Sequence, residues 1–240
     1  MPRGVPKWSA VTTPGLLALV GGGEWRDGCD FDAELLEASG DRRVVVLPTA
    51  AAYQRPERQV ITAARWFARF DAEVEGLMVV RRADADDDGA ADVVRRASLL
   101  YVGDGSALHL RSVLKGSKVW AALQAAWRGG TVVAGSGAGA MVLTDPMVDP
   151  RGGALTVGLG LVDRLAVVSH LGDSAEDAHG EKLHRSVLLA PDGLPIVGIP
   201  ERTALLRDPG GGWRSTGVGV PAVYLNGEPA ALGLGALSGG

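Results

Sequence analysis

The stretch Thr131-Val132-Val133-Ala134-Gly135-Ser136-Gly137-Ala138-Gly139-Ala140 decides the fold of this chain. Residues 131–134 form a short, β-branched apolar run that is typical of a buried strand. The run leads into three glycines at alternate positions and then into small residues that begin a helix. A strand, a turn of the type G-x-S-x-G and a helix together form a nucleophile elbow, whose central side chain stands above a helix N-terminus. The central residue of this turn is Gly137, which has no side chain.

Similar apolar runs precede this stretch. They predict strands at residues 16–20, 43–48, 77–80 and 99–102, and helical spacing predicts helices at residues 32–38, 57–71, 108–114 and 119–127. Uninterrupted apolar strands joined by helical crossovers indicate a parallel sheet that is covered on both faces. We therefore expect a doubly wound, mostly parallel α/β fold.

The last third of the chain has a different pattern. Residues 165–169, 196–199 and 203–207 are expected strands, and Asn226-Gly227 between apolar runs is a hairpin signal. No linker and no internal repeat divides the sequence. We therefore expect one domain over residues 1–240, with a core at about 16–207, added antiparallel strands and a C-terminal hairpin at 213–235.

Composition limits the classes of partner. The chain has 240 residues, 46% of them apolar and 22% charged, which is usual for a globular protein. Its net charge of −4 gives no reason to expect nucleic acid or an anionic membrane as a partner. The apolar run at 16–20 is too short for a signal peptide, and no run approaches the ~20 residues that span a bilayer. A cytoplasmic protein is expected, and the single cysteine, Cys29, excludes a disulfide framework.

Three glycine-containing loops follow predicted strands, at residues 21–23, 103–105 and 135–139. In open parallel sheets, the loops beyond the carboxyl ends of the strands form the binding crevice. Glycines in such loops let main-chain N–H groups approach a ligand closely, although tight-turn chemistry alone also explains any one of them. Gly22 and Gly23 are therefore candidates for substrate binding.

The familiar motifs for binding nucleotides and metal ions are incomplete. A dinucleotide fingerprint that starts at Gly21 fails because Arg26 stands at its third glycine position. No P-loop lysine follows any glycine run. Alternating aspartates from Asp84 imitate the start of a calcium loop, but Arg95 replaces its bidentate glutamate. His179 and His184, five residues apart, do not share a helix face. We expect neither a cofactor nor a metal ion.

Five segments, in this order, resemble the landmarks of the cyanophycinase and aspartyl dipeptidase family. They are residues 19–23 (LVGGG), 103–105 (GDG), 135–140 (GSGAGA), 169–171 (SHL) and 198–204 (GIPERTA). The resemblance spans about residues 16–207, and its elbow and histidine segments are the most specific. It implies a flavodoxin-like sheet similar to that of class I glutamine amidotransferases. It also implies a Ser-His-acid hydrolase that cleaves peptide bonds next to aspartyl residues.

The resemblance places the family's roles on particular residues. The nucleophilic serine falls on Gly137 and the histidine on His170. The oxyanion donors fall on Ala138 and on Gly103 or Asp104. Asp149, with Asp145 as an alternative, lies in the interval where the acid is expected, and Glu201 is a candidate for the site wall. Arg151, Arg111 or Arg185 could pair with a substrate carboxylate.

Gly137 leaves two possibilities open. Ser136 could attack in its place if the elbow were rearranged, or covalent catalysis is lost. The chain is then either a serine-peptidase-like hydrolase whose activity is lost or impaired, or a pseudopeptidase that binds a peptide or an acidic small molecule. A third option, an amidotransferase-like enzyme that uses Cys29, is disfavoured because Cys29 lies outside the elbow. The resemblance makes a homodimer plausible.

Overall fold

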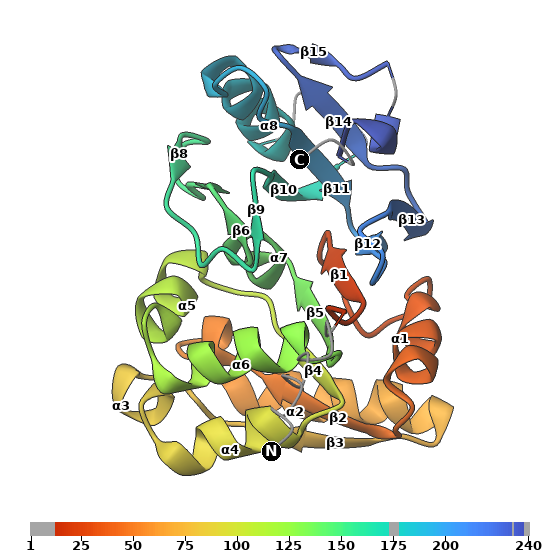
Figure 1. Cartoon of the computed structure of the whole chain (residues 1–240), viewed down its shortest axis with the longest axis vertical. Coiled ribbons are helices and arrows are strands. Elements are labelled where there is room, and N and C mark those ends of the chain that lie inside the picture. Colours follow the sequence, from red (N-terminus) through yellow and green to blue (C-terminus); the bar gives the residue numbers. More distant parts are fainter. Residues whose placement is uncertain (1–12, 173–177, 232, 238–240) are drawn as a thin grey trace, which may run out of the picture.

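The computed structural model describes residues 13–172, 178–231 and 233–237. Its centre is a seven-stranded sheet, whose strands are labelled in Figure 1. Five strands of this sheet run parallel: β1 (Leu17–Val20), β2 (Arg43–Leu47), β3 (Glu73–Gly76), β4 (Leu99–Val102) and β5 (Val132–Ser136). Strands β12 (Thr203–Arg207) and β13 (Trp213–Gly217) continue it in the antiparallel sense. The strand order is β13-β12-β1-β5-β4-β2-β3, which confirms the predicted α/β class.

Helices cover both faces of this sheet. Successive strand residues point to opposite sides, so the apolar strands present apolar side chains on both faces. Helices α1 (Phe31–Ser39) and α2 (Pro56–Phe67) pack on one face, with Ala18 and Val20 of β1. The other face carries Leu17 and Leu19 and is covered by α4 (Asp88–Arg96), α5 (Ala107–Leu114), α6 (Lys118–Arg128) and α7 (Ala138–Val142), with the short α3 (Arg82–Ala85) beside them. The doubly wound arrangement is confirmed.

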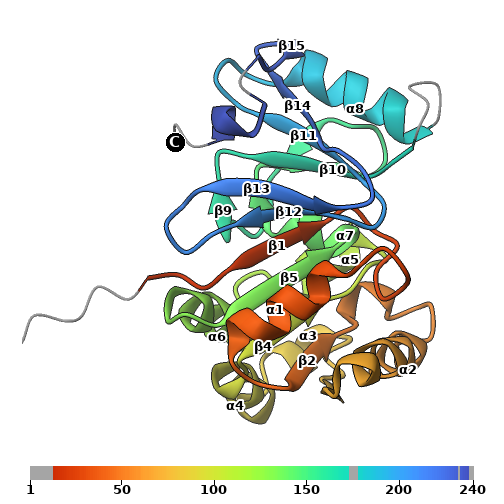
Figure 2. The same ribbon diagram turned by 90° about the vertical axis from the view of Figure 1, so that its right-hand side faces the viewer.

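A second, smaller sheet lies beyond β12 (Figure 2). It has the order β10 (Ala166–Leu171), β11 (Ile196–Pro200), β14 (Ala222–Leu225) and β15 (Glu228–Pro229), and helix α8 (Ala178–Leu189) packs against it. The predicted hairpin at Asn226-Gly227 joins β14 and β15, with φ of 54° and 84° at these two residues. Two short ribbons pair β6 (Thr144–Asp145) with β9 (Val162–Asp163) and β7 (Met147–Val148) with β8 (Leu155–Thr156).

Two expectations about strands need correction. The third strand is β3, Glu73–Gly76, and not residues 77–80. β3 is the edge strand of the sheet, so its side chains alternate between exposed and half-buried, and it lacks the apolar run of a central strand. The segment 213–235 is likewise not one hairpin, because β13 joins the large sheet while β14 and β15 join the small one.

None of the helices in the described ranges is both long and apolar enough to cross a membrane.

Strand pairing brings the glycine loops together. Val20 pairs with Ser136, and Val102 pairs with Gly135, so the loops after β1, β4 and β5 meet at one edge of the sheet. Because β12 is antiparallel to β1, it begins rather than ends at this edge. The turn that precedes Thr203 therefore reaches the same place.

Candidate active site

The elbow after β5 has the backbone geometry that its motif predicts. Gly137 has φ 53° and ψ −111°, a conformation that side-chain-bearing residues adopt only under strain, and it immediately precedes α7. Its N–H donates to the carbonyl of Val20 at 2.9 Å. A Cβ atom on Gly139 would lie 2.4 Å from the carbonyl oxygen of Val102, so glycine is required for the close approach of α7 to β4. The sharp turn is therefore present although residue 137 carries no side chain.

His170 reaches this edge from a β-bulge near the end of β10. The register between β10 and β11 shifts between Val168 and Leu171, and His170 has φ 56°. Such a bulge re-aims a side chain, here toward the elbow. The His170 N–H donates to the carbonyl of Gly21 at 2.6 Å. A Cβ atom on Gly22 would lie 2.2 Å from Cε1 of the imidazole, so the backbone of the loop after β1 packs directly against the ring.

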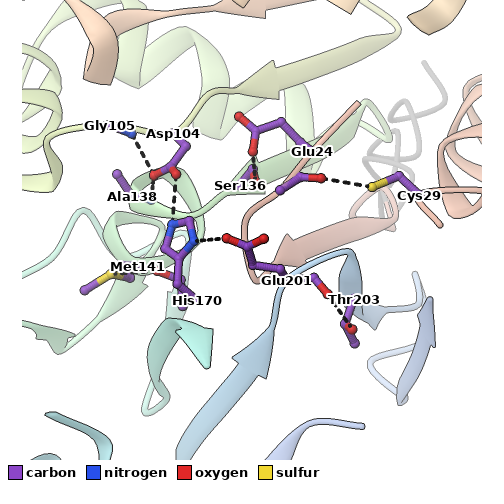
Figure 3. Close-up of polar contacts among 12 residues, drawn as sticks. Glu24, Cys29, Asp104, Gly105, Ser136, Ala138, Met141, His170, Glu201 and Thr203 are labelled. Atoms are coloured by element: carbon purple, nitrogen blue, oxygen red, sulfur yellow. Dashed lines mark hydrogen bonds and ion pairs between the residues drawn. The ribbon is translucent and has the colours of Figure 1, made fainter. Parts of the chain in front are cut away.

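Two carboxylates hold the imidazole of His170 (Figure 3). Nε2 lies 2.8 Å from Oδ2 of Asp104, and Nδ1 lies 3.1 Å from Oε1 of Glu201. The hydrogen bond to Asp104 is the largest cause that raises the pKa of His170; burial opposes it, and the charges of both carboxylates add to it. The pKa reaches about 9, so the ring is an imidazolium at neutral pH.

The carboxylate of Asp104 is surrounded by donors. Its Oδ1 accepts from the main-chain N–H groups of Ala138 at 2.7 Å and Gly105 at 2.6 Å. Burial acts to raise the pKa of Asp104, but these bonds and the contact with His170 outweigh it, so the pKa is lowered. Gln59 of α2 fixes the same loop, because its Nε2 donates to the Asp104 carbonyl at 2.7 Å. The structure thus brings the two predicted oxyanion residues into direct contact, with the side chain of Asp104 accepting a hydrogen bond from the Ala138 N–H.

The Asp104 carboxylate also occupies the space that a side chain at residue 137 would need. A Cβ atom on residue 137 would lie 2.1 Å from both Cγ and Oδ1 of Asp104. These distances are far inside van der Waals contact. A side chain at residue 137 and this position of the Asp104 carboxylate therefore exclude each other.

Gly103 is placed differently from its expected role as an oxyanion donor. Its N–H donates to the carbonyl of Leu47 at 3.0 Å and so extends the pairing of β4 with β2. That hydrogen is consequently directed into the sheet, and the N–H of Ala138 is the predicted donor that faces the site.

Asp149, the expected acid, lies against Arg151 instead of His170. Its Oδ2 is 2.6 Å from Nη2 of Arg151 and its Oδ1 is 3.0 Å from Nε. The hydrogen bonds from Arg151 lower the pKa of Asp149 to about 2. The expected substrate-binding guanidinium is thus already paired, with Arg151 75% exposed. Oδ1 of the alternative acid, Asp145, accepts from the N–H of Gly158. The acid at Nδ1 of His170 is Glu201, which was expected only in the site wall.

Ser136 is directed away from the imidazole. Its side chain is fully buried, and Oγ donates to Oε2 of Glu24 at 2.8 Å. Burial is the main cause that raises the pKa of Glu24, and the nearby charge of Asp104 adds to it. Glu24 follows directly after the glycines of the β1 loop. Sequence reasoning missed Glu24 and Gln59, since neither belongs to a motif that could reveal a buried partner.

Cys29 and His179 also lie near the site. Cys29 is buried, its Sγ lies 3.5 Å from the carbonyl oxygen of Gly23, and burial raises its pKa to about 11. Such a thiol is protonated and a poor nucleophile. The ring of His179, on α8, lies 5.6 Å from that of His170, whereas His184 is exposed. Within the described part of the chain, no three His, Cys, Asp or Glu side chains form a group that could hold a metal ion.

A cavity of about 1030 Å³ lies elsewhere and is lined by Trp127, Arg207 and Trp213 among others. Arg207 ends β12 and pairs with Leu17, at the end of β1 opposite to its glycine loop. The cavity is thus separate from the cluster around His170.

Comparison with known proteins identifies the family and supports the fold. The family model of peptidase family S51 matches residues 17–211. A crystal structure of a peptidase from an acI-B1 Actinobacterium is similar, with 26% identity, a TM-score of 0.79 and coverage of 90% of this chain and 93% of that chain. A peptidase E-type protein from Listeria monocytogenes EGD-e has 16% identity, a TM-score of 0.65 and coverage of 86% and 100%, respectively, and supports the fold. No protein among those with curated descriptions matches significantly. Since the family model covers most of the sequence, the chain belongs to peptidase family S51.

Proposed function

We propose that this chain is a member of the S51 family that binds peptides with an aspartyl or other acidic residue and has lost the covalent step of a serine peptidase. The observation that carries the proposal is the elbow itself. Its backbone conformation is that of a nucleophile turn, yet the residue at its centre is Gly137. A peptidase of this type forms its acyl-enzyme through the hydroxyl at that position.

The protonation of the site supports binding rather than covalent turnover. In a Ser-His-acid enzyme, a neutral imidazole removes the proton from the attacking hydroxyl. Here Nε2 of His170 contacts the Asp104 carboxylate, and the pKa of about 9 keeps the ring charged at pH 7. Glu201 at Nδ1 stabilises the same charged form. The site therefore offers a cation to an anionic group instead of a base to a hydroxyl.

A preference for acidic ligands follows from the donors. The imidazolium of His170 and the main-chain N–H of Ala138 converge on one carboxylate in the structure, that of Asp104. Hydrogen bonds from a charged donor to a carboxylate are stronger than those between neutral groups. An aspartyl or glutamyl side chain, or a peptide C-terminus, presents the same group.

The proposal is tested with a panel of Asp-containing peptides, whose binding is measured by calorimetry and whose hydrolysis is measured by mass spectrometry. The natural chain is compared with the double variant Gly137→Ser/Asp104→Ala, in which the serine has room. We expect the natural chain to bind without cleaving and the double variant to cleave. His170→Ala in the double variant should abolish cleavage.

The expected difference in rate is large. Without the attacking hydroxyl, a triad enzyme retains only about 10³–10⁴-fold acceleration over water. Hydrolysis by the natural chain at a rate similar to that of the double variant would contradict the loss of the covalent step. Failure of the natural chain to bind any acidic peptide would contradict the binding role.

A further inference from the structure

We propose that the Asp104 carboxylate is an internal ligand, which occupies the subsite for a carboxylate of the bound peptide and must leave before that peptide can enter. This inference rests on the proposed function and adds to it a specific subsite and a residue that controls access to it.

The subsite is built from three donors on different segments. They are the N–H of Ala138 in the elbow, the N–H of Gly105 after β4, and Nε2 of His170 from β10, at 2.7, 2.6 and 2.8 Å from the Asp104 carboxylate. Together they contact both oxygens of one carboxylate. Figure 3 shows Asp104 enclosed between Ala138, Gly105 and the imidazole.

Gly137 provides the space for this arrangement. With a Cβ atom at residue 137 only 2.1 Å from Cγ of Asp104, the carboxylate could not stay where it is. The glycine in the elbow and the aspartate in the neighbouring loop are therefore linked: the missing side chain of one makes room for the other. The Asp104 carboxylate then accepts hydrogen bonds from donors that, in a peptidase, stabilise the negative charge on the reacting group.

Charge balance favours one carboxylate in this subsite. Among the described residues, the charged groups near it are the imidazolium of His170, which also contacts Glu201 and His179, and the buried Glu24, whose pKa is raised mainly by burial and further by the charge of Asp104. Among the described residues, His170 is the cation that contacts the Asp104 carboxylate, so a second carboxylate beside Asp104 would find this cation already paired. Binding therefore requires exchange of one carboxylate for another.

Exchange predicts a measurable penalty on affinity. A site that is open in a fraction of molecules binds with its intrinsic dissociation constant divided by that fraction. If Asp104 closes the subsite in nine molecules out of ten or more, its removal should strengthen the binding of an acidic ligand by about tenfold or more. Ligands that lack a carboxylate should gain far less.

The test uses acetate, the simplest carboxylate, and needs no peptide. The pKa of His170 is followed by NMR in the natural chain, in Asp104→Ala and in Asp104→Asn. Without acetate, both variants should show a pKa well below about 9, the value with Asp104 in place. Acetate should raise it again in Asp104→Ala and leave the natural chain unchanged. Asp149→Ala, which removes a carboxylate that pairs with Arg151, is the matched control and should behave as the natural chain.

Calorimetry with N-acetyl-aspartate amide and its asparagine analogue completes the test. Asp104→Ala should bind the aspartate compound at least about tenfold more tightly than the natural chain does, with little change for the asparagine compound. Equal or weaker binding, or no response of His170 to acetate in a folded Asp104→Ala protein, would overturn the inference. Because acetate reports on the subsite alone, a failure of peptide binding remains distinguishable. Asp104→Asn, which preserves the shape of the side chain, provides a folded variant if alanine disturbs the loop.

Discussion

The carboxylate of Asp104 lies where the side chain of residue 137 would be, because a Cβ atom on Gly137 would approach Cγ of Asp104 to 2.1 Å. The two positions are thus energetically coupled. Gly137→Ala should destabilise the protein by about 1–3 kcal/mol from its positive φ alone, and displacement of Asp104 should add to this. In the Asp104→Ala background the same change should cost less. Urea denaturation of the four proteins measures the coupling, and additive effects would contradict the overlap.

Ser136 should prove structural. Removal of its hydroxyl takes from the buried Glu24 its hydrogen bond of 2.8 Å, so Ser136→Ala should lower the free energy of unfolding by about 1–3 kcal/mol. The exposed Ser112→Ala is the control and should stay within about 0.5 kcal/mol. A fluorophosphonate probe should leave the natural chain unlabelled. Labelling that disappears in Ser136→Ala would instead identify Ser136 as a nucleophile.

Substitutions of Glu201 and Asp149 should differ clearly in their effect on His170. Glu201 contacts Nδ1 of His170 at 3.1 Å, so Glu201→Gln should lower the pKa of the imidazole and weaken the binding of acidic peptides. Asp149→Asn should change neither, because the Asp149 carboxylate contacts Arg151. NMR titration of His170 in both variants measures the difference. An effect of Asp149→Asn as large as that of Glu201→Gln would restore Asp149 as the acid.

Stability should fall at alkaline pH. The pKa of His170 is raised from 6.5 to about 9 in the folded chain, so between these values the folded state binds a proton that the unfolded state has released. The stabilisation is therefore complete below about pH 6.5 and is lost as pH rises through 9. Unfolding measured from pH 6 to 10 should show this decline in the natural chain. His170→Gln, which removes the charge facing Asp104, Glu201 and His179, should show less of it, and parallel curves would contradict the assignment.

A side chain at Gly22, in the loop after β1, should displace the imidazole of His170. Gly22 has φ 105°, and its Cβ atom would lie 2.2 Å from Cε1 of His170. Gly22→Ala should displace the ring, lower its pKa and weaken acidic-peptide binding about tenfold or more, by the free energy of one charged hydrogen bond. Gly40→Ala provides the control, since Gly40 also has positive φ but a Cβ there would meet no described atom within 4 Å. It should cost stability without changing the His170 titration.

The central strands of the fold are predictable because both faces of each are buried. β4 is apolar throughout, and β2 and β5 contain uninterrupted apolar runs at residues 44–47 and 132–134, so hydrophobicity alone locates these strands within a residue or two. β3 is not predictable in the same way, since its side chains alternate at the edge of the sheet. The elbow is predictable from sequence because its glycines indicate a sharp turn, and the conformation of a turn depends on residues that are adjacent in the chain.

The carboxylate that contacts Nδ1 of His170 is not predictable from sequence, because its position depends on pairing between strands that are distant in the chain. Chain order placed it between the elbow and His170, at Asp149. The structure instead brings Glu201, which follows His170 in the chain, to Nδ1 through the antiparallel pairing of β12 with β1. The position of the Asp104 carboxylate was equally hidden, since it depends on an absent side chain in another loop.

The loop after β1 forms main-chain hydrogen bonds with two segments that are far from it in the chain, at His170 and at residues 202–203. The carbonyl of Gly21 receives the N–H of His170, its N–H donates to Thr203, and the carbonyl of Gly22 receives the N–H of Arg202. Histidine and acid are therefore aligned by main-chain bonds to a loop that excludes residue 137. A serine at residue 137 would consequently find His170 already held in position, but it could be accommodated only with a second change that moves the Asp104 carboxylate.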